Sequence, residues 1–305
     1  MPNTFDLQIQ STASDGKHTP REIVIMAKEL GLQTIALTDH DTVSGIAEAL
    51  AAGAECGVRV IQGIEMSVEE YGAHILGFGV NHENADFLAE LQKFKEGRLE
   101  TAKTMVENLK RAGFAVDWED VEREKTGEVV ARPHLARAVM KRPENKEKLS
   151  GVQSVHDFIE RFLANDSPNY VKRTAISAKD AIALLHSAGG AAVWSHPAIH
   201  FKGNYEELES FLKKLIEWGI DGIEVFNAPH TEDDAEFLQG LAVQYNLLRT
   251  AGSDFHEKGD HPADPETGLH SARTLGDYET YGFDTNDIVE KLDQIMKQKI
   301  DISGG

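Results

Sequence analysis

The chain has 305 residues, of which 41% are hydrophobic, enough for one large core or for a core with a smaller inserted domain. Acidic residues outnumber basic ones by 51 to 31, so the formal net charge is −20, which argues against duplex DNA or an anionic membrane as the main partner. A short nucleotide is not excluded, because bound divalent cations would offset the local negative field.

Short apolar runs alternate with amphipathic segments in the first part of the chain. Residues 19–31 predict a helix, because Thr19 suits the N-cap, Pro20 the first helical position and Gly31 the stop. A second helix is predicted at residues 43–57. Strands are predicted at residues 5–10, 34–38, 58–67 and 73–80, and no helix fits before the last of them.

The same alternation resumes in the second half of the chain. Helices are predicted at residues 177–190, 205–219, 231–246 and 284–299. Strands are predicted at residues 191–196, 220–227 and 247–254. Repeated strand–helix units predict an α/β fold with parallel strands and right-handed crossovers. About seven strands of this kind favour a barrel over an open sheet.

The stretch 84–170 breaks this rhythm. It is predicted to be helical throughout, lacks β-branched runs and is rich in Lys, Arg and Glu. We interpret it as a helical cap that is inserted over the mouth of a barrel formed by residues 1–83 and 171–305. The alternative is an enlarged outer layer of helices around the barrel.

Cysteine usage and the amino terminus indicate the compartment. Cys56 is the single cysteine, so the chain cannot form an internal disulfide. The first residues lack the basic and apolar regions of a signal peptide, and no apolar run approaches the length of a membrane span. We therefore expect a cytoplasmic protein.

Metal-ligand residue types fall at or just after the predicted strand ends, where parallel barrels place their sites. These residues are Asp15, His40, Glu65, His74, His196, Asp254 and His256. A single histidine after a strand is weak evidence, but seven such placements are improbable by chance. Mixed imidazole and carboxylate ligands predict a site for two or three divalent metals, with Mn, Fe or Zn favoured over Mg or Ca. Glu65 is the candidate to bridge two of them.

The segments STASDG, LTDHDT, GIEMS, AHILGFG, WSHP and GSDFH resemble, in order and spacing, the motifs of the PHP (polymerase and histidinol phosphatase) superfamily. The resemblance covers nearly the whole chain. The segment ARPHLARAV in the insert resembles the stand-alone phosphoesterases of that superfamily, which include nucleoside 3′,5′-bisphosphate phosphatases and 5′–3′ exoribonucleases.

The resemblance implies a distorted (β/α)7 barrel with up to three metals, held by the seven ligand-type residues. It also implies that Arg132 and His134 reach the phosphate of the substrate. An arginine fork grips phosphate in a bidentate manner, and a histidine beside it can donate a hydrogen bond. The alternative is that Arg132 only caps or pairs within the insert.

The first motif departs from the family, which has His-x-His on the first strand where this chain has Gln8 and Gln10. Residues two apart on a strand face the same side, so both amides are expected to point into the mouth. An amide oxygen is a poorer ligand than imidazole for Mn, Fe or Zn, so metal binding by Gln8 and Gln10 is doubtful.

Three interpretations of this departure remain. In the first, one metal position is weak or empty and the other ligands still hold a working pair, and we favour this one. In the second, another side chain substitutes, and His18 is the nearest candidate. In the third, hydrolysis is lost and the protein binds nucleotide or metal without turnover.

The expected function is hydrolysis of phosphate monoesters of nucleotides, such as nucleoside 3′,5′-bisphosphates, by a metal-bound hydroxide. Asp254 and His256 are candidates to orient the nucleophile, and His134 to assist the leaving group. One alternative is 5′–3′ exoribonuclease activity on short single-stranded RNA. The other is a catalytically impaired nucleotide-binding or metal-binding protein. The negative charge favours a small phosphorylated substrate over a long anionic strand.

Overall fold

The computed structural model describes residues 3–125, 130, 132–164, 166–171, 176–201, 203–259, 272 and 274–303. The chain divides into two compact units. Unit 1 comprises residues 1–89 and 176–305, and unit 2 comprises residues 90–175. The division falls inside the long helix α3 (Ala85–Arg111), which therefore contributes residues to both units.

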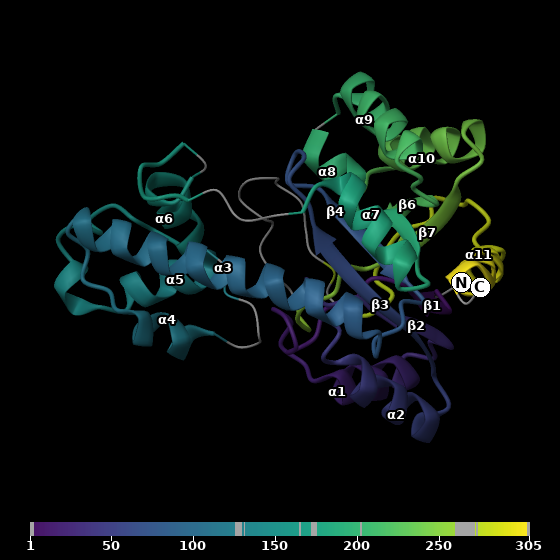
Figure 1. The fold of residues 1–305 in the computed structure, drawn as a ribbon, viewed down its shortest axis with the longest axis horizontal. Helices are drawn as coiled ribbons and strands as arrows, with labels where there is room; N and C mark the ends of the chain where they lie inside the picture. Colours follow the sequence, from purple (N-terminus) through teal and green to yellow (C-terminus); the bar gives the residue numbers. More distant parts are fainter. Residues whose placement is uncertain are drawn as a thin grey trace. The chain divides into compact units, whose positions relative to one another are not determined.

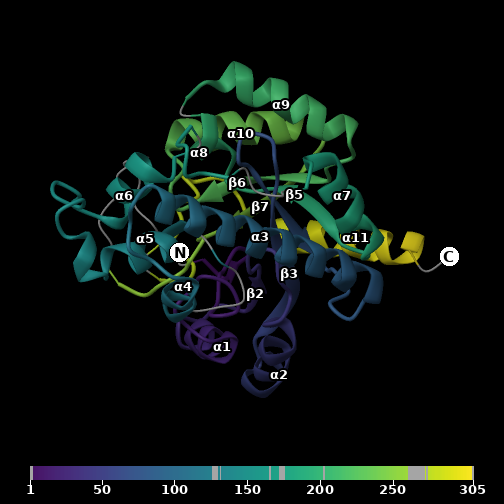
Figure 2. The same ribbon diagram turned by 60° about the vertical axis from the view of Figure 1, so that its left-hand side comes forward.

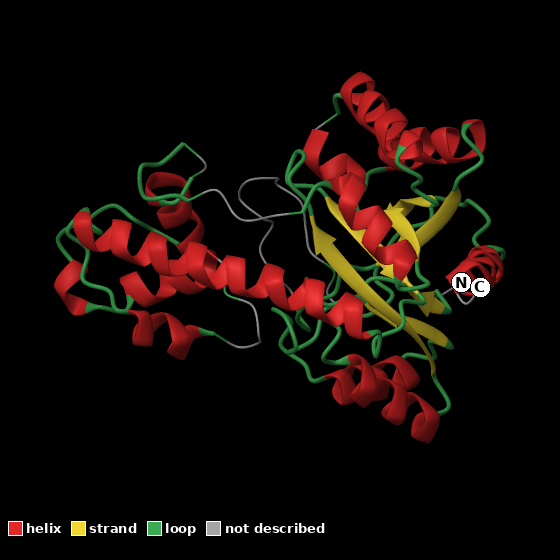
Figure 3. Ribbon diagram, viewed as in Figure 1, coloured by secondary structure: helices red, strands yellow, loops and turns green. Residues whose placement is uncertain are grey.

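Unit 1 is built on a seven-stranded sheet whose strands follow one another in sequence order (Figure 3). The strands are β1 (Phe5–Asp6), β2 (Thr34–Leu37), β3 (Arg59–Ser67), β4 (His74–Phe78), β5 (Ala191–Trp194), β6 (Gly222–Asn227) and β7 (Leu248–Gly252). Neighbouring strands are parallel except at β4, which runs antiparallel to both β3 and β5. The parallel arrangement predicted for the repeated strand–helix units therefore does not extend to β4. The short connection between β3 and β4 can only turn the chain back, because a parallel crossover needs about a dozen residues or more.

The chain beyond β1 pairs with β7 and nearly closes the sheet into a barrel. Leu7 N donates to Ala251 O at 3.1 Å, and Asp254 N donates to Gln8 O at 3.0 Å. Ile9 forms a parallel bridge with Phe255. The first strand is thus shorter than the predicted 5–10, yet the residues after it nearly close the barrel. The predicted fold class, a distorted seven-stranded barrel, is confirmed.

Helices cover the outside of this sheet, and Figures 1 and 2 show α1 and α2 beside β2 and β3, and α10 beside β6 and β7. The helices of this unit are α1 (Pro20–Glu29), α2 (Ile46–Cys56), α7 (Ala178–Ser187), α8 (Pro197–Phe201), α9 (Tyr205–Glu217), α10 (Glu232–Gln244) and α11 (Ile288–Ser303). The start of α1 is as predicted: Thr19 accepts from Glu22 N, and Glu22 accepts from Thr19 N. The short helix α8 was not predicted.

The core of unit 1 includes a cluster of aromatic rings formed by Trp194 of β5, Phe201 of α8 and Phe211 of α9. The Trp194 ring lies 5.2 Å from Phe211 and 5.8 Å from Phe201, both nearly edge-on. Trp194 and Phe211 are almost completely buried. Aromatic pairs of this kind add about 0.5–1.5 kcal/mol beyond the burial of their area, so they fix α8 and α9 against the strand.

Unit 2 is helical, as predicted for the insert. Besides its part of α3, it contains α4 (Trp118–Glu124), α5 (Arg132–Met140), the 3₁₀ turn η1 (Pro143–Asn145) and α6 (Val155–Phe162). Its own hydrophobic core includes the buried rings of Phe114 and Phe158, with centroids 5.6 Å apart. Within that core, the buried Asn145 amide donates to Ala115 O and Val139 O. The role of the insert as a cap over the mouth stays a prediction.

Among the described residues, no helix is long and apolar enough to cross a bilayer.

Asp6 ties the end of β1 to the loop after β7, and its burial has a consequence for stability. Its carboxylate accepts from Ser253 Oγ at 2.5 Å and from Gly276 N at 2.7 Å. Burial raises the pKa of Asp6 to about 6, although these hydrogen bonds lower it. The folded protein therefore binds this proton more tightly than the unfolded chain does.

We expect the Asp6 contribution to favour folding fully below about pH 4 and to be lost as the pH rises past about 6. A shift of this size corresponds to about 3 kcal/mol. Urea unfolding between pH 4 and 7 would measure it, with Asp6→Asn as the control that cannot titrate. Identical pH profiles for the two proteins would contradict the expectation.

Candidate metal centre

The predicted ligands lie at one rim of the barrel in unit 1. Asp15 follows β1, His40 follows β2, His196 follows β5, and Asp254 and His256 follow β7. Glu65 lies inside β3, two positions before its end.

His74 was expected at or just after the carboxyl end of a strand, but it begins β4. Because β4 is antiparallel, its first residue pairs with Ser67 at the carboxyl end of β3, and so His74 reaches the same rim.

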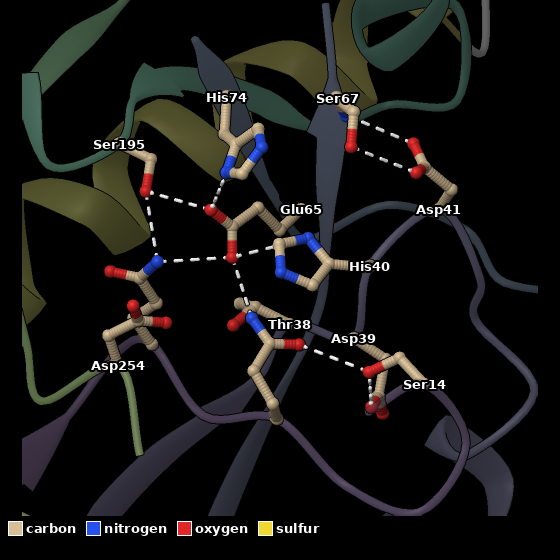
Figure 4. Close-up of polar contacts among 12 residues, drawn as sticks. Ser14, Thr38, Asp39, His40, Asp41, Glu65, Ser67, His74, Ser195 and Asp254 are labelled. Carbon is tan, nitrogen blue, oxygen red and sulfur yellow. Dashed lines mark hydrogen bonds and ion pairs between the residues drawn. The ribbon is translucent and has the colours of Figure 1, made fainter. Parts of the chain in front are cut away.

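Glu65 is the centre of the polar cluster, and its carboxylate is fully buried. Figure 4 shows the carboxylate between His40 and His74, with Ser195 beside it. Glu65 Oε1 lies 2.8 Å from His74 Nδ1, 3.0 Å from His196 Nε2 and 3.1 Å from Ser195 Oγ. The start of β4 and the residues after β5 thus present two imidazoles and a hydroxyl group to a single oxygen atom.

His40 stands between two groups of ligand-type side chains. One group is Asp15, His40 and His256, and the other is His40, Glu65 and His74; in each, the ligand atoms lie within 4.8 Å of one another. The Nε2 atom of His40 lies 4.0 Å from Asp15 Oδ2, and its Nδ1 lies 3.8 Å from Glu65 Oε2. The two ring nitrogens of His40 therefore face different groups.

The loop after β2 holds His40 in place by continuing the pairing with β3. His40 forms a parallel bridge with Glu65, and Asp41 N donates to Glu65 O at 2.9 Å. The Asp41 carboxylate, at a residue with φ of 52°, accepts from Ser67 N and Ser67 Oγ. His40 is therefore placed by backbone contacts as well as by its own ring.

The loop that carries Asp15 is held by a second buried carboxylate. Asp39 accepts from Ser11 N and Ser11 Oγ, both at 2.7 Å, and from Ser14 Oγ at 2.6 Å (Figure 4 draws Ser14 and Asp39). A Cβ at Gly16 would lie 2.3 Å from Gln10 O, so only glycine fits this turn. The loop thus folds back onto the first strand and presents Asp15 at the rim.

Two predicted ligands have unusual backbones. His196 has a φ of 25° and Asp254 a φ of 54°, conformations that are uncommon for residues other than glycine. Hydrogen bonds hold both: His196 N donates to Glu224 Oε2 at 2.8 Å, and Asp254 N donates to Gln8 O. Backbone strain of this kind is often found at functional sites.

The charges and the burial of the cluster determine which of its side chains are protonated. Burial alone would lower the pKa of His196, but the hydrogen bond and charge of Glu65 outweigh it and raise the pKa to about 9. Burial would raise the pKa of Glu65, yet the neighbouring imidazoles, led by His40, hold it well below the usual range. Glu65 is therefore a carboxylate at neutral pH. His200, on α8, is made less basic by burial, which lowers its pKa to about 3.

Gln8 and Gln10 point into this cluster, as expected, and both are fully buried. The amide nitrogens donate to Glu65 Oε2, Gln8 at 3.1 Å and Gln10 at 2.6 Å. His18, the candidate substitute ligand, instead stacks on Phe255 and accepts from Lys258 N at 3.4 Å. It belongs to neither group of ligand-type side chains found among the described residues.

Arg132 and His134 lie in unit 2, at the start of α5. Arg132 Nη1 donates to Leu163 O at 3.2 Å, and its guanidinium lies 5.5 Å from the Tyr170 ring. His134 is buried. These contacts agree with the alternative of a structural role for Arg132 within the insert, and the contact with substrate phosphate stays a prediction.

Comparison with known proteins identifies the family. The model of the PHP domain matches residues 6–227 of the chain. This chain belongs to the PHP domain family. The predicted family is therefore confirmed, and the matched residues include the ligand-type residues from Asp15 to His196.

Relatives of this PHP chain include enzymes that act on phosphate esters. It is 33% identical to a 3′,5′-nucleoside bisphosphate phosphatase of Chromobacterium violaceum, over 84% of this chain and 88% of the relative. It is 32% identical to a 5′-3′ exoribonuclease of Haemophilus influenzae, over 84% of this chain and 91% of the relative. A solved structure from Bifidobacterium adolescentis, a predicted metal-dependent phosphoesterase, matches with a TM-score of 0.74 and 27% identity, over 97% of this chain and 98% of that one.

The donor set of this PHP domain fits divalent metals at two positions. Carboxylates and imidazoles converge there, and these are the ligand types of Mn, Fe and Zn. Within the described part of the chain, the buried atoms His40 Nδ1, His196 Nδ1 and Asp254 Oδ1 make no hydrogen bond, as expected of atoms reserved for another partner. Use of divalent metal agrees with the structural relative.

Several residues of the site escaped sequence reasoning. Ser195 and Asn227 bind the Gln8 side chain, and Asp39 holds the Asp15 loop. Ser195 lies inside the motif WSHP and Asp39 inside LTDHDT, but all three are common polar residues, so their type does not single them out. The one available signal was position, since Ser195 precedes His196 and Asp39 precedes His40.

Proposed function

We propose that this PHP chain is a metal-dependent phosphoesterase that hydrolyses phosphate monoesters of nucleotides, such as nucleoside 3′,5′-bisphosphates. The broader class, a metal-dependent phosphoesterase, is the one predicted from the sequence, and the family and relatives bear it out. One observation carries the proposal: two groups of ligand-type side chains share His40 at a single rim. Two cation positions so close together suit a phosphate group that both can polarise.

Bound divalent cations, which the ligand types suggest are Mn, Fe or Zn, would supply Lewis acidity at the phosphoryl group and an activated water. The chain's own residues hold the site in shape. His256 Nδ1 lies 2.7 Å from the Asp254 carbonyl oxygen, which can only accept, so this nitrogen carries a proton. The other nitrogen, Nε2, then faces Asp15 Oδ1 at 3.5 Å with its lone pair available when the ring is neutral.

Asp254 and His256 are also proposed to orient the attacking water. The proposal follows from their placement, because both side chains lie at the end of β7 beside the Asp15 loop.

We further propose that the insert, residues 84–170, supplies the substrate contacts. Arg132 would grip the phosphate with its planar guanidinium, while His134 would donate to the leaving oxygen. The relevant property is residue type: two cationic or donor groups two positions apart at the start of α5. An Arg132→Lys change keeps the charge but removes the bidentate fork, so it tests geometry separately from charge.

The size of the substrate is argued from charge. A net charge of −20 would repel a long anionic strand away from the metal rim, and this favours mononucleotides. The exoribonuclease relative is the observation that keeps short single-stranded RNA as the second candidate.

Phosphate release would test the proposal directly. The full chain, loaded with Mn²⁺, would be assayed on adenosine 3′,5′-bisphosphate and on 5′-phosphorylated RNA of increasing length, with Glu65→Ala as control. We expect release from the bisphosphate well above the control, with rates that fall as the RNA becomes longer. Rates that rise with RNA length would favour the exoribonuclease. No release above the control on any substrate would favour a silent binding protein.

A further inference from the structure

The geometry points to Gln8 and Gln10 as a neutral replacement for a cation at one oxygen of Glu65. We propose that the two amides close Glu65 Oε2 to metal, so that this chain binds two divalent cations where its family resemblance implies up to three. The inference rests on the proposed metal centre but not on turnover, because it concerns how many cations bind.

The first step is the saturation of Glu65 Oε2. This atom accepts from Gln10 Nε2 at 2.6 Å and from Gln8 Nε2 at 3.1 Å. The second amide hydrogen of Gln8 points to Ser195 Oγ, at 2.9 Å. All four side chains are fully buried, so water does not compete for these bonds. Two N–H donors therefore stand where a ligated carboxylate oxygen would face a cation.

The second step is the orientation of the amides, which the neighbours decide. Asn227 Nδ2 donates to Gln8 Oε1 at 2.8 Å, so the Gln8 oxygen points away from Glu65. A flipped Gln8 would set its oxygen against the Glu65 carboxylate and its NH₂ against the NH₂ of Asn227. For Gln10, the 2.6 Å distance to Glu65 Oε2 excludes an oxygen in that place, since two acceptors would repel. In both residues, the amide oxygen, which is the atom able to bind metal, is turned away.

The third step is the contrast with the other oxygen of Glu65. Oε1 faces His74 Nδ1 and His196 Nε2, and an imidazole nitrogen becomes a metal ligand once it loses its proton. We therefore assign one cation to the group of His40, Glu65 and His74, with Glu65 contributing Oε1 and His40 contributing Nδ1. The second cation belongs to Asp15, His40 and His256, with His40 contributing the nitrogen that faces Asp15. Glu65 is then a ligand of one cation, rather than the bridge expected from the sequence.

The amide arrangement also predicts how the metal-free protein behaves. When no metal is bound, the negatively charged Glu65 Oε2 still accepts two hydrogen bonds from the amides. A pair of imidazoles at these positions would need added protons or a cation to compensate the same buried charge. Removal of metal by a chelator should therefore lower the stability of this chain less than that of a variant with histidines at both positions.

The experiment counts metal. Wild type, the double variant Gln8→His/Gln10→His and the control Gln8→Met/Gln10→Met would be dialysed against Mn²⁺, and bound Mn²⁺ per chain measured by elemental analysis. We expect two per chain for wild type, a gain of one for the histidine variant and no gain for the methionine control, which removes the amides without adding a ligand. Three per chain in wild type, or no gain in the histidine variant, would overturn the inference.

A single variant tests the same inference if the double variant folds poorly. The single variant Gln10→His keeps Gln8 and its bonds to Asn227 and Ser195. It should gain Mn²⁺ relative to wild type, and EDTA should lower its melting temperature more than that of wild type; an unchanged metal count and an equal EDTA shift would overturn the inference. Phosphate release is measured separately. Absence of turnover in all variants, with the expected metal counts, would reject the proposed function and leave the amide replacement standing.

Discussion

Glu65→Gln is expected to reduce phosphate release by at least about 100-fold, the upper end of the effects seen when a group that supports a metal ligand is lost. Both oxygens of the Glu65 carboxylate contact other side chains: Oε1 contacts two imidazoles, and Oε2 accepts from two amides. Glutamine has the same shape but no charge, so the cation on the Oε1 side would lose its anionic ligand while the volume is kept.

The substitution is chosen so that the fold survives. An amide oxygen at the Oε2 position still accepts from Gln8 and Gln10, and the NH₂ group at the Oε1 position donates to His74 or His196 once their rings are neutral. Steady-state kcat/KM and bound Mn²⁺ would both be measured, together with the melting temperature. A variant with full activity and an unchanged metal count would show that Glu65 is not a ligand. Because Glu65→Gln keeps the buried volume and the hydrogen bonds at the Oε2 position, loss of activity with an unchanged melting temperature would assign the effect to the lost anionic ligand.

The strand–helix rhythm of the sequence was sufficient to predict the barrel, because its local signals agree with the tertiary structure. Thr19 and Pro20 mark the start of α1, and Gly57, with a φ of 74°, follows the end of α2 where a stop was expected. Such signals depend on a few neighbouring residues. The direction of β4 does not, since it follows from the length of the turn before it and from pairing with β5, whose residues lie far away in the sequence.

The sequence predicted the residue types of the candidate site but not which side-chain atoms bond to one another. Motif order placed Asp15, His40, Glu65 and His196 at a common rim, which the structure shows. The partners of each atom were out of reach, because they depend on how buried amides and hydroxyls orient one another. The direction in which Gln8 points its oxygen is decided by Asn227, 219 positions away. Likewise, nothing in a motif shows that Glu65 Oε2 already accepts hydrogen bonds from two buried amides.

The closure of the barrel beside this site depends on Gly252, the last residue of β7. A Cβ at this position would lie 2.5 Å from Gln8 Cβ, 2.6 Å from Gln8 N and 3.0 Å from Gln8 Cα. Two of these atoms are backbone, and the third is bonded directly to it, so no side-chain rotation relieves the overlap. The strand that carries Gln8 must therefore move away from β7, and with it the hydrogen bond from Asp254 N to Gln8 O.

Gly252→Ala is accordingly expected to lower the free energy of unfolding by at least about 3 kcal/mol, the upper part of the range for overpacked cores. Gly240 offers a matched control, because it is exposed within α10 and a Cβ there meets no atom within 4 Å. Gly240→Ala should stabilise the protein by about 0.5–1 kcal/mol through the higher helix propensity of alanine. Urea unfolding of the two variants would then shift in opposite directions. Because Gly252 acts by separating two strands rather than by binding metal, Mn²⁺ should not restore its stability to that of wild type. Equal midpoints for Gly252→Ala and wild type would mean that the first strand and β7 can part without cost, and that the rim does not depend on their contact.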